Sequence, residues 1–266
     1  MSNVLALTGG PKAIAGKAMP PDLFRWPVVT AEDEAAVLEV LRTGQMSGST
    51  ITRAFEKEFA AWAGVPFALA YPNGTESLRA AMWACGVGAG DEVICPSMTY
   101  WASCTSALSL GAAVHFADIR PDTLCIDPAD IERRIGPRTR AIVAVHYAGH
   151  PCDMDSILAM ARRHDVRVIE DVSHAHGGLY KGKMVGSFGD VACMSMMSGK
   201  AFPIGEGGML LTGNQEIYER CIAYGFYERT GVASRWNAPD MQITRPELKL
   251  FAGVPLGGFD SRLAYQ

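Results

Sequence analysis

From residue 67 to residue 169 the chain repeats one pattern, a short and mostly apolar run followed by a longer segment with helical spacing. Short apolar strands that alternate with helices form a mainly parallel sheet with helices on both faces. We therefore predict an α/β fold. The expected strands lie at 67–71, 92–95, 114–116, 141–145 and 166–169, and the expected helices near 75–86, 101–110, 128–134 and 154–164.

The segment before this region has a different character. Residues 1–30 are rich in Gly and Pro and show little periodicity, so we expect an arm or irregular lead-in. Thr30 then caps a helix, because acidic residues occupy the first turn after it. A second helix is expected over 53–63, where Phe55, Phe59 and Trp62 have helical spacing. In the first helix, the residues that we expect to form a buried stripe are Val37, Leu38, Val40 and Leu41.

Composition restricts the partners and the compartment. The 266-residue chain has 24 Lys and Arg against 28 Asp and Glu, a formal charge of -4 that gives no overall basic field for nucleic acid or an anionic membrane. No apolar run approaches the length of a membrane span, and the first ten residues lack the basic region of a signal peptide, so we expect a cytoplasmic protein. The seven cysteines are scattered without a CxxC pair, which predicts reduced core residues rather than disulfides or a zinc site.

Lys200 lies between an apolar run and a glycine-rich turn, within 195–211. A lysine amine attacks a carbonyl only when it is neutral, and desolvation by apolar neighbours favours that form. The neighbours here are Met196, Met197 and Phe202, so Lys200 is a candidate nucleophile for Schiff-base chemistry. The alternatives are a surface lysine or a phosphate-binding GxxxxGK[ST] loop. The loop fails, because Met194 stands where the first Gly is needed and Ala201 where Ser or Thr is needed.

Ligands of α/β sheets bind beyond the carboxyl ends of the strands, and polar segments follow several predicted strands at 73–77, 96–101, 146–147 and 171–174. Segment 73–77 joins a strand to a helix, where free N–H groups and the helix dipole favour a phosphate, although Thr75 could simply cap the helix. Tyr100 and Trp101 could stack on a planar ring or belong to the core. No G-x-G-x-x-G motif follows a predicted strand, which argues against a dinucleotide site of the Rossmann type.

Glu170 and Asp171 end a buried strand, where a charge is costly unless it has a partner. A protonated ring nitrogen would be one such partner of Asp171, and a helix terminus or an ion pair would be the alternatives. His174 and His176 could be read as a metal pair, but no further ligand is in register. We therefore expect His174 to hydrogen-bond a ligand and His176 to be structural, with no metal.

Together these features supply what pyridoxal 5'-phosphate (PLP) requires of a protein. A loop at a helix start anchors the phosphate, and an aromatic side chain stacks on the ring. A strand-end carboxylate keeps the pyridine nitrogen protonated, and a lysine binds the aldehyde as an imine. The combination is far more specific than any one of its members, and it predicts PLP as the cofactor.

The sequence resembles the DegT/DnrJ/StrS-type aminotransferases, fold-type I PLP enzymes that aminate keto-sugars and keto-cyclitols. The resemblance extends from about residue 24 to 213 and is carried by 55–60, 73–75, 90–94, 96–99, 145–149, 169–171, 174–177 and 205–208. It implies a fold-type I large domain over 31–235 with a mainly parallel central sheet. The arm at 1–30 precedes this domain, and 236–266 begins a C-terminal region whose small domain is largely absent.

The resemblance also implies roles for individual residues. Lys200 matches the internal-aldimine lysine, which then shuttles the proton, Asp171 pairs with the pyridine nitrogen, and His174 lies near the phenolic oxygen of the cofactor. Tyr100 matches the stacking aromatic residue. The matches to phosphate contacts are Gly74, Thr75, the backbone of Glu76, and Ser195. Some family members carry histidine in place of the lysine and act as dehydratases, and Lys200 argues against that branch.

The implied partners are a small-molecule keto substrate, an amino-acid donor such as glutamine or glutamate, and a second copy of the chain in a homodimer. The Ser-Gly-Lys form at 198–200, with 229–231 and 253–258, resembles the branch that acts on keto-inositols, and nucleotide-linked keto-sugars are the other substrate class. Family members continue well past a segment like 258–263, which we expect to start a C-terminal helix. A catalytically impaired PLP-binding fragment and a family member with another keto substrate are therefore alternatives.

Overall fold

The computed structural model describes residues 4–12, 25–47 and 49–225. The features predicted at 229–231, 253–258 and 258–263, and the region 236–266, lie outside the described residues. The chain divides into two compact units, Met1–Met46 and Ser47–Gln266. The first unit contains a 3-10 turn, η1 (Ala6–Thr8), and helix α1 (Ala31–Thr43).

Helix α1 begins where the sequence predicted, because Thr30 and Asp33 form a capping box. The Thr30 hydroxyl accepts the N–H of Asp33 at 3.3 Å, and Asp33 Oδ2 accepts the N–H of Thr30 at 2.7 Å. The predicted buried stripe is wrong, since no residue of α1 is buried and Val37 and Leu41 are 60% and 55% exposed. An apolar stripe is buried only where another apolar surface packs on it, and the described part of this unit provides no such surface.

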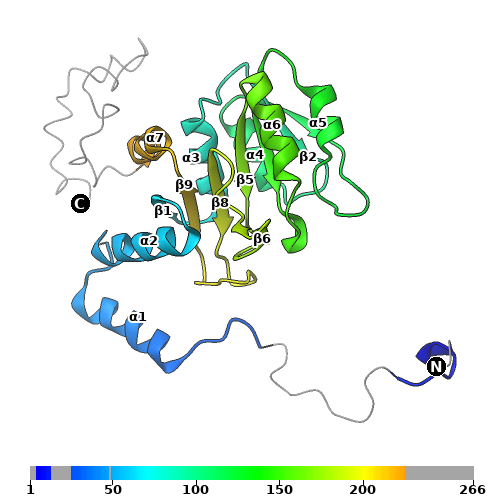
Figure 1. Ribbon diagram of the computed structural model, residues 1–266. Helices are drawn as coiled ribbons and strands as arrows, with labels where there is room; N and C mark the ends of the chain where they lie inside the picture. The colour runs from blue at the N-terminus through cyan, green and yellow to red at the C-terminus, as the bar shows by residue number, and fades with distance from the viewer. Residues whose placement is uncertain (1–3, 13–24, 48, 226–266) are drawn as a thin grey trace, which may run out of the picture. The chain divides into compact units, whose positions relative to one another are not determined.

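The second unit is built on a seven-stranded sheet with the order β1-β9-β8-β5-β4-β2-β3 (Figure 1). Neighbouring strands are parallel from β8 to β3, whereas β9 runs antiparallel to β1 and to β8. The predicted mainly parallel sheet is therefore confirmed. The strands are β1 (Phe67–Tyr71), β2 (Glu92–Pro96), β3 (Ala113–Ala117), β4 (Thr139–Val145), β5 (Arg167–Asp171), β8 (Val191–Ser195) and β9 (Gly208–Thr212); β6 (Leu179–Tyr180) and β7 (Lys183–Met184) form a separate hairpin.

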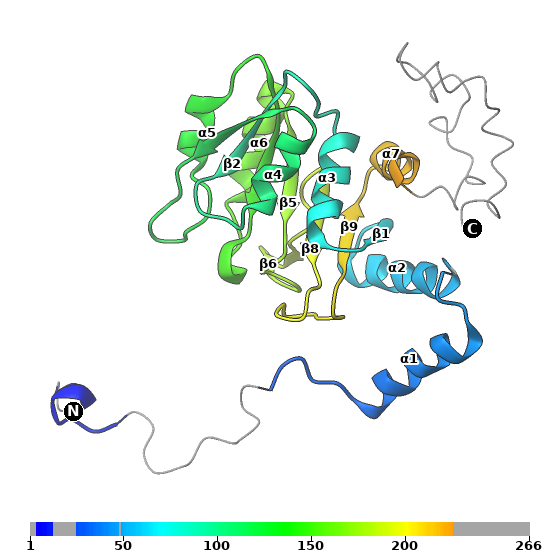
Figure 2. The same ribbon diagram turned by 180° about the vertical axis from the view of Figure 1, so that it is seen from behind.

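Helices cover both faces of this sheet, as predicted (Figure 2). Adjacent residues of β4 point to the two faces: Val143 belongs to the apolar cluster that includes residues of α3, α4 and α7, and Ile142 belongs to the cluster that includes residues of α5 and α6. Between residues 67 and 171 the predicted elements are all present, with ends shifted by no more than two residues. The helices are α2 (Ser49–Ala63), α3 (Gly74–Ala84), α4 (Ala102–Ser109), α5 (Pro128–Arg134), α6 (Met154–His164) and α7 (Gln215–Gly225), with a 3-10 turn, η2 (Tyr147–Gly149).

The cysteines are core residues. All seven are free and buried, which confirms the prediction from their scattered spacing. Cys221, for example, lies on the buried face of α7 and contacts α3, and burial raises the pKa of its thiol to about 12. A thiol in this state is protonated at neutral pH and behaves as a small apolar side chain.

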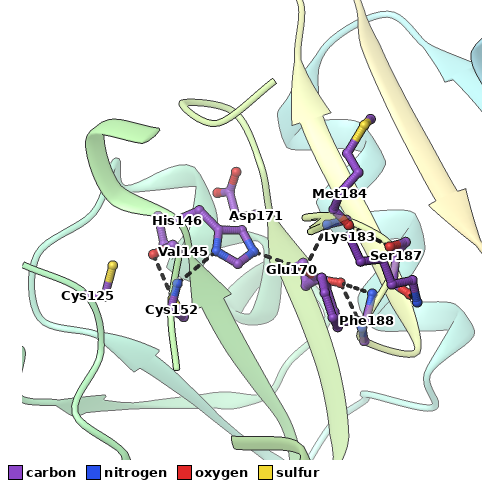
Figure 3. Close-up of polar contacts among 12 residues, drawn as sticks. Cys125, Val145, His146, Cys152, Glu170, Asp171, Lys183, Met184, Ser187 and Phe188 are labelled. Carbon is purple, nitrogen blue, oxygen red and sulfur yellow. Dashed lines mark hydrogen bonds and ion pairs between the residues drawn. The ribbon is translucent and has the colours of Figure 1, made fainter. Parts of the chain in front are cut away.

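A buried carboxylate holds the strand ends together (Figure 3). Glu170 Oε1 accepts the N–H groups of Phe188 and Gly189 at 2.8 and 2.7 Å, and Oε2 accepts the N–H of Gly186 at 2.8 Å. His146 Nε2 lies 3.0 Å from Oε2. Burial opposes the charge of Glu170, but these hydrogen bonds outweigh it and lower the pKa of the carboxyl group.

His146 extends this network to the neighbouring strand. Its Nδ1 accepts the N–H of Cys152 at 3.0 Å, so the ring proton lies on Nε2 and is donated to Glu170. The backbone N–H of His146 donates to the carbonyl oxygen of Asp171 at 3.1 Å. The ends of β4 and β5 are thus tied to each other and to the 186–189 turn, which leads into β8.

The network predicts a large effect of Glu170→Gln. The amide places an NH2 group where a carboxylate oxygen accepted N–H groups, so at least one buried donor loses its acceptor. We expect a loss of about 2–3 kcal/mol of unfolding free energy at neutral pH, measured by urea denaturation. Glu132→Gln is the matched control, because Glu132, like Glu170, contacts a histidine, but it is exposed and its other partner is an arginine, so its change should be small.

The same variant should alter the response to acid. Because the native pKa of Glu170 lies below the ordinary value of 4.5, its contribution is complete above pH 4.5 and is lost as the pH falls through the native pKa. The stability gap between parent and Glu170→Gln should therefore narrow below pH 4.5. A gap that stays constant from about pH 7 to about pH 3 would contradict this role of the carboxylate.

Candidate active site

Most of the predicted binding residues line one cavity, at the carboxyl ends of β4, β5 and β8. Its volume is about 500 Å³, within the range of roughly 300–1,000 Å³ found for small-molecule sites. Of the residues that the sequence singled out for PLP, Glu76 does not line it. The lining residues are Asn73, Gly74, Thr75, Leu78, Thr99, Tyr100, Ala102, Val145, Asp171, Ser173, His174, Ser195, Met197, Lys200 and Glu206.

The start of α3 forms one wall of the cavity. Asn73, not Thr75, is the N-cap, because its side-chain oxygen accepts the N–H of Glu76 at 2.9 Å. The alternative role of Thr75 as the cap is therefore wrong, and the N–H of Glu76 is already used. The N–H groups of Gly74 and Thr75 have no acceptor among the described residues, as is usual in a first helical turn. Together with the helix dipole, they can bind an anion.

Two glycines allow this helix start to approach the neighbouring strands. A Cβ atom on Gly74 would lie 2.9 Å from Cβ of Ser195. A Cβ atom on Gly208 would lie 2.4 Å from both the carbonyl carbon and the oxygen of Asn73. Gly208 was visible in the sequence only as part of the glycine-rich turn, and its role depends on a contact between distant segments.

Asp171 lies at the end of β5 and is 5% exposed. Its Oδ2 accepts the hydroxyl of Ser103 at 2.7 Å, and its Oδ1 accepts the N–H of Ser173 at 3.1 Å. Both donors are neutral, so these contacts are hydrogen bonds and not ion pairs. A carboxylate has about four acceptor positions, so Asp171 can still accept an N–H group from a ligand in the cavity.

Lys200 lies in the turn after β8 and is half-buried. Its backbone N–H donates to the carbonyl oxygen of Met197 at 2.8 Å. The ring of Phe202 packs against those of Phe59 and Trp62 on α2, with centroids 5.7 and 6.4 Å away. Lys200 therefore borders the cavity from a turn that backbone hydrogen bonding and the packing of Phe202 help to hold. Of the predicted apolar neighbours, Met196 is buried, whereas Met197 and Phe202 are about 40% exposed.

The remaining predicted residues lie at or behind the cavity wall. Tyr100 borders the cavity and is 58% exposed, so its side chain is accessible to a ligand. His174 contacts the ring of Tyr147 edge-on at 5.8 Å, and partial burial and the charge of Lys200 lower its pKa. His176 Nε2 lies 2.9 Å from the carbonyl oxygen of Ser195, in agreement with a structural role. Among the described residues, no group of three or more His, Cys, Asp and Glu is arranged to hold a metal ion.

These side chains fit PLP. Amide N–H groups suit a phosphate, an exposed aromatic ring suits a planar heterocycle, a buried carboxylate suits a pyridinium N–H, and a primary amine suits an aldehyde. All four groups border the same cavity. The arrangement suits a binding site for PLP.

The chain belongs to the DegT/DnrJ/EryC1/StrS aminotransferase family, which matches residues 27–241 and uses PLP. It is 45% identical to a GDP-perosamine synthase of Caulobacter vibrioides, with 72% of this chain and 52% of the relative covered. It is 38% identical to an L-glutamine:2-deoxy-scyllo-inosose aminotransferase of Streptomyces fradiae, with 83% and 52% covered. An aminotransferase structure from Psychrobacter cryohalolentis matches with a TM-score of 0.73 and 41% identity over 75% of this chain and 51% of that one. The chain spans about half the length of the curated relatives it matches.

The contact of Gly208 predicts a local defect in Gly208→Ala. The added methyl group would collide with backbone atoms of Asn73, so the start of α3 must shift. We expect a loss of about 1–3 kcal/mol of unfolding free energy and weaker PLP binding, measured by urea denaturation and fluorescence titration. Gly213→Ala is the control, because a Cβ atom there meets nothing within 4 Å. Equal behaviour of the two variants would contradict the close contact.

Proposed function

We propose that the protein transfers an amino group from an amino acid, glutamine or glutamate, to a keto-cyclitol or a nucleotide-linked keto-sugar. The observation that carries this proposal is the meeting of Lys200, Asp171 and the amide groups of Gly74 and Thr75 on one cavity. Family membership supports the reaction class. The names of the relatives support the substrate classes, since one is an L-glutamine:2-deoxy-scyllo-inosose aminotransferase and another is a GDP-perosamine synthase.

In this proposal each wall of the cavity has one task. Gly74, Thr75 and Ser195 hold the phosphate of PLP, and Tyr100 stacks on its ring. Asp171 accepts the N–H of the pyridine ring, and His174 contacts the phenolic oxygen. Glu76 contributes through the helix that its N–H helps to cap, rather than through a free N–H group.

Lys200 is the residue that would bind the cofactor covalently. When bound, PLP supplies an electron sink that stabilises negative charge at the substrate carbon. The Nζ atom of Lys200 would hold the cofactor at its aldehyde carbon, and once the donor amine took that place, the free Nζ atom would be the group that accepts and returns a proton. Donor and keto substrate then react in turn, which gives ping-pong kinetics.

Substrate branch, assembly and compartment are also proposals. We infer a keto-inositol substrate from the Ser-Gly-Lys sequence at 198–200 and from the similarity to inosose aminotransferases. We infer a homodimer with active sites at its interface, which the exposed apolar residues of α1 support, because an apolar stripe that no described residue of its own unit covers favours a partner surface. We infer a cytoplasmic location. Within the described residues, no helix has the length and apolar character of a membrane span.

An absorbance titration tests the proposed reaction. PLP added to the purified protein should give an imine band, and excess L-glutamine should convert it to the amine form, because the first half-reaction needs only the donor. A band that forms and never shifts with glutamine or glutamate would favour the alternative of a catalytically impaired PLP-binding chain. The absence of any band would contradict the proposal.

A further inference from the structure

A buried hydroxyl group lies directly behind Asp171. Ser103, in the first turn of α4, is fully buried and does not line the cavity. Its Oγ lies 2.7 Å from Asp171 Oδ2 and 2.8 Å from Thr99 Oγ1. Sequence reasoning assigned no role to Ser103, because the residue it contacts is 68 positions away.

The direction of these hydrogen bonds follows from the donors available. A carboxylate accepts and cannot donate, so the single proton of the Ser103 hydroxyl goes to Asp171. Thr99 must then donate its own proton to Ser103 Oγ, although the 2.8 Å contact alone permits either direction. The result is a chain of donors from Thr99, on the cavity wall, through Ser103 to Asp171. Hydrogen bonds in such a chain strengthen one another.

This series of hydrogen bonds restrains one of the two oxygens of the Asp171 carboxylate, Oδ2. Ser173 N–H holds Oδ1 and Ser103 holds Oδ2, so Asp171 is restrained at both oxygens. Without the Ser103 hydroxyl, one oxygen loses its protein donor, and the side chain can rotate away from the position that faces the cavity. This rotation would affect the binding of a ligand only through the ligand atom that Asp171 contacts.

We propose that Ser103, oriented by Thr99, is a positioning residue that holds Asp171 toward the ring nitrogen of bound PLP. This inference rests on the proposed function, since it assumes that Asp171 faces that nitrogen. The proposal predicts a selective effect on ligand binding. Loss of the Ser103 hydroxyl must weaken the binding of ligands that have the ring nitrogen and leave unchanged the binding of ligands that lack it.

The test compares PLP with its 1-deaza analogue, in which carbon replaces the ring nitrogen. Both keep the phosphate and the aldehyde, so the ratio of their dissociation constants isolates the contact with Asp171. We expect the parent to prefer PLP and Ser103→Ala to reduce that preference by about tenfold, the value of one hydrogen bond to a charged group. Ser103→Thr keeps a hydroxyl group and should restore most of the preference, and Thr99→Val should reduce it in part.

Ser109→Ala is the matched control. Ser109 is also on α4, and its hydroxyl donates to the carbonyl oxygen of Ser106 at 2.7 Å, away from Asp171. It should leave both dissociation constants unchanged. Urea denaturation of each variant shows that binding is compared between folded proteins.

The outcomes separate the two claims. If Ser103→Ala weakens both compounds equally, or neither, the parent's preference for PLP is retained and the positioning role is overturned. A parent that binds PLP no better than the deaza analogue would show that Asp171 does not contact the ring nitrogen, and would also overturn it. A parent that binds neither compound would overturn the proposed function, and this inference with it.

Discussion

The buried carboxylate of Glu170 joins the strand ends on which the cavity depends. It binds the turn before β8 and, through His146, the end of β4, while its own strand carries Asp171. Successive side chains of a strand point to opposite faces, so these adjacent acids have separate tasks. The carboxylate oxygens of Glu170 accept hydrogen bonds from the protein itself, whereas those of Asp171 can also accept a hydrogen bond from a ligand. A carboxylate with four donors also shows how a charge can remain in a core.

The anion-binding wall depends on close backbone contacts. Gly74 lets the start of α3 lie against Ser195, and Gly208 lets β9 lie against Asn73. β9 is antiparallel to both β1 and β8. The glycine-rich turn after Lys200 therefore brings the start of β9 back to the end of β8, where the cavity lies. The turn therefore presents the lysine and also positions the loop that faces it.

Much of this arrangement could be predicted from the sequence, because its signals are local. Apolar runs of strand length and helical spacing predicted β1 to β5 and the helices between them, and the rule that ligands bind at the carboxyl ends of strands placed Asp171 and Thr75 together. β8 and β9 were not predicted, and Lys200 joined the site only as part of the set of groups that PLP requires. The contacts that depend on distant segments could not be predicted. The cap at Asn73 in place of Thr75, the hydroxyl of Ser103 and the four donors of Glu170 require the folded chain. The predicted burial of the stripe on α1 was wrong although the helical spacing of its apolar residues is present, because burial also requires another apolar surface packed on the helix.

The most direct test of the account is to identify the residue that binds the cofactor covalently. Borohydride reduction of the protein loaded with PLP, followed by dialysis and peptide mass spectrometry, should place the label on Lys200. Lys200→Ala should lose the label, whereas Lys183→Ala, which changes an exposed lysine on the β6–β7 hairpin, should retain it. A label that remains in Lys200→Ala, or that lies on another lysine, would contradict the central claim that this cavity is built around Lys200.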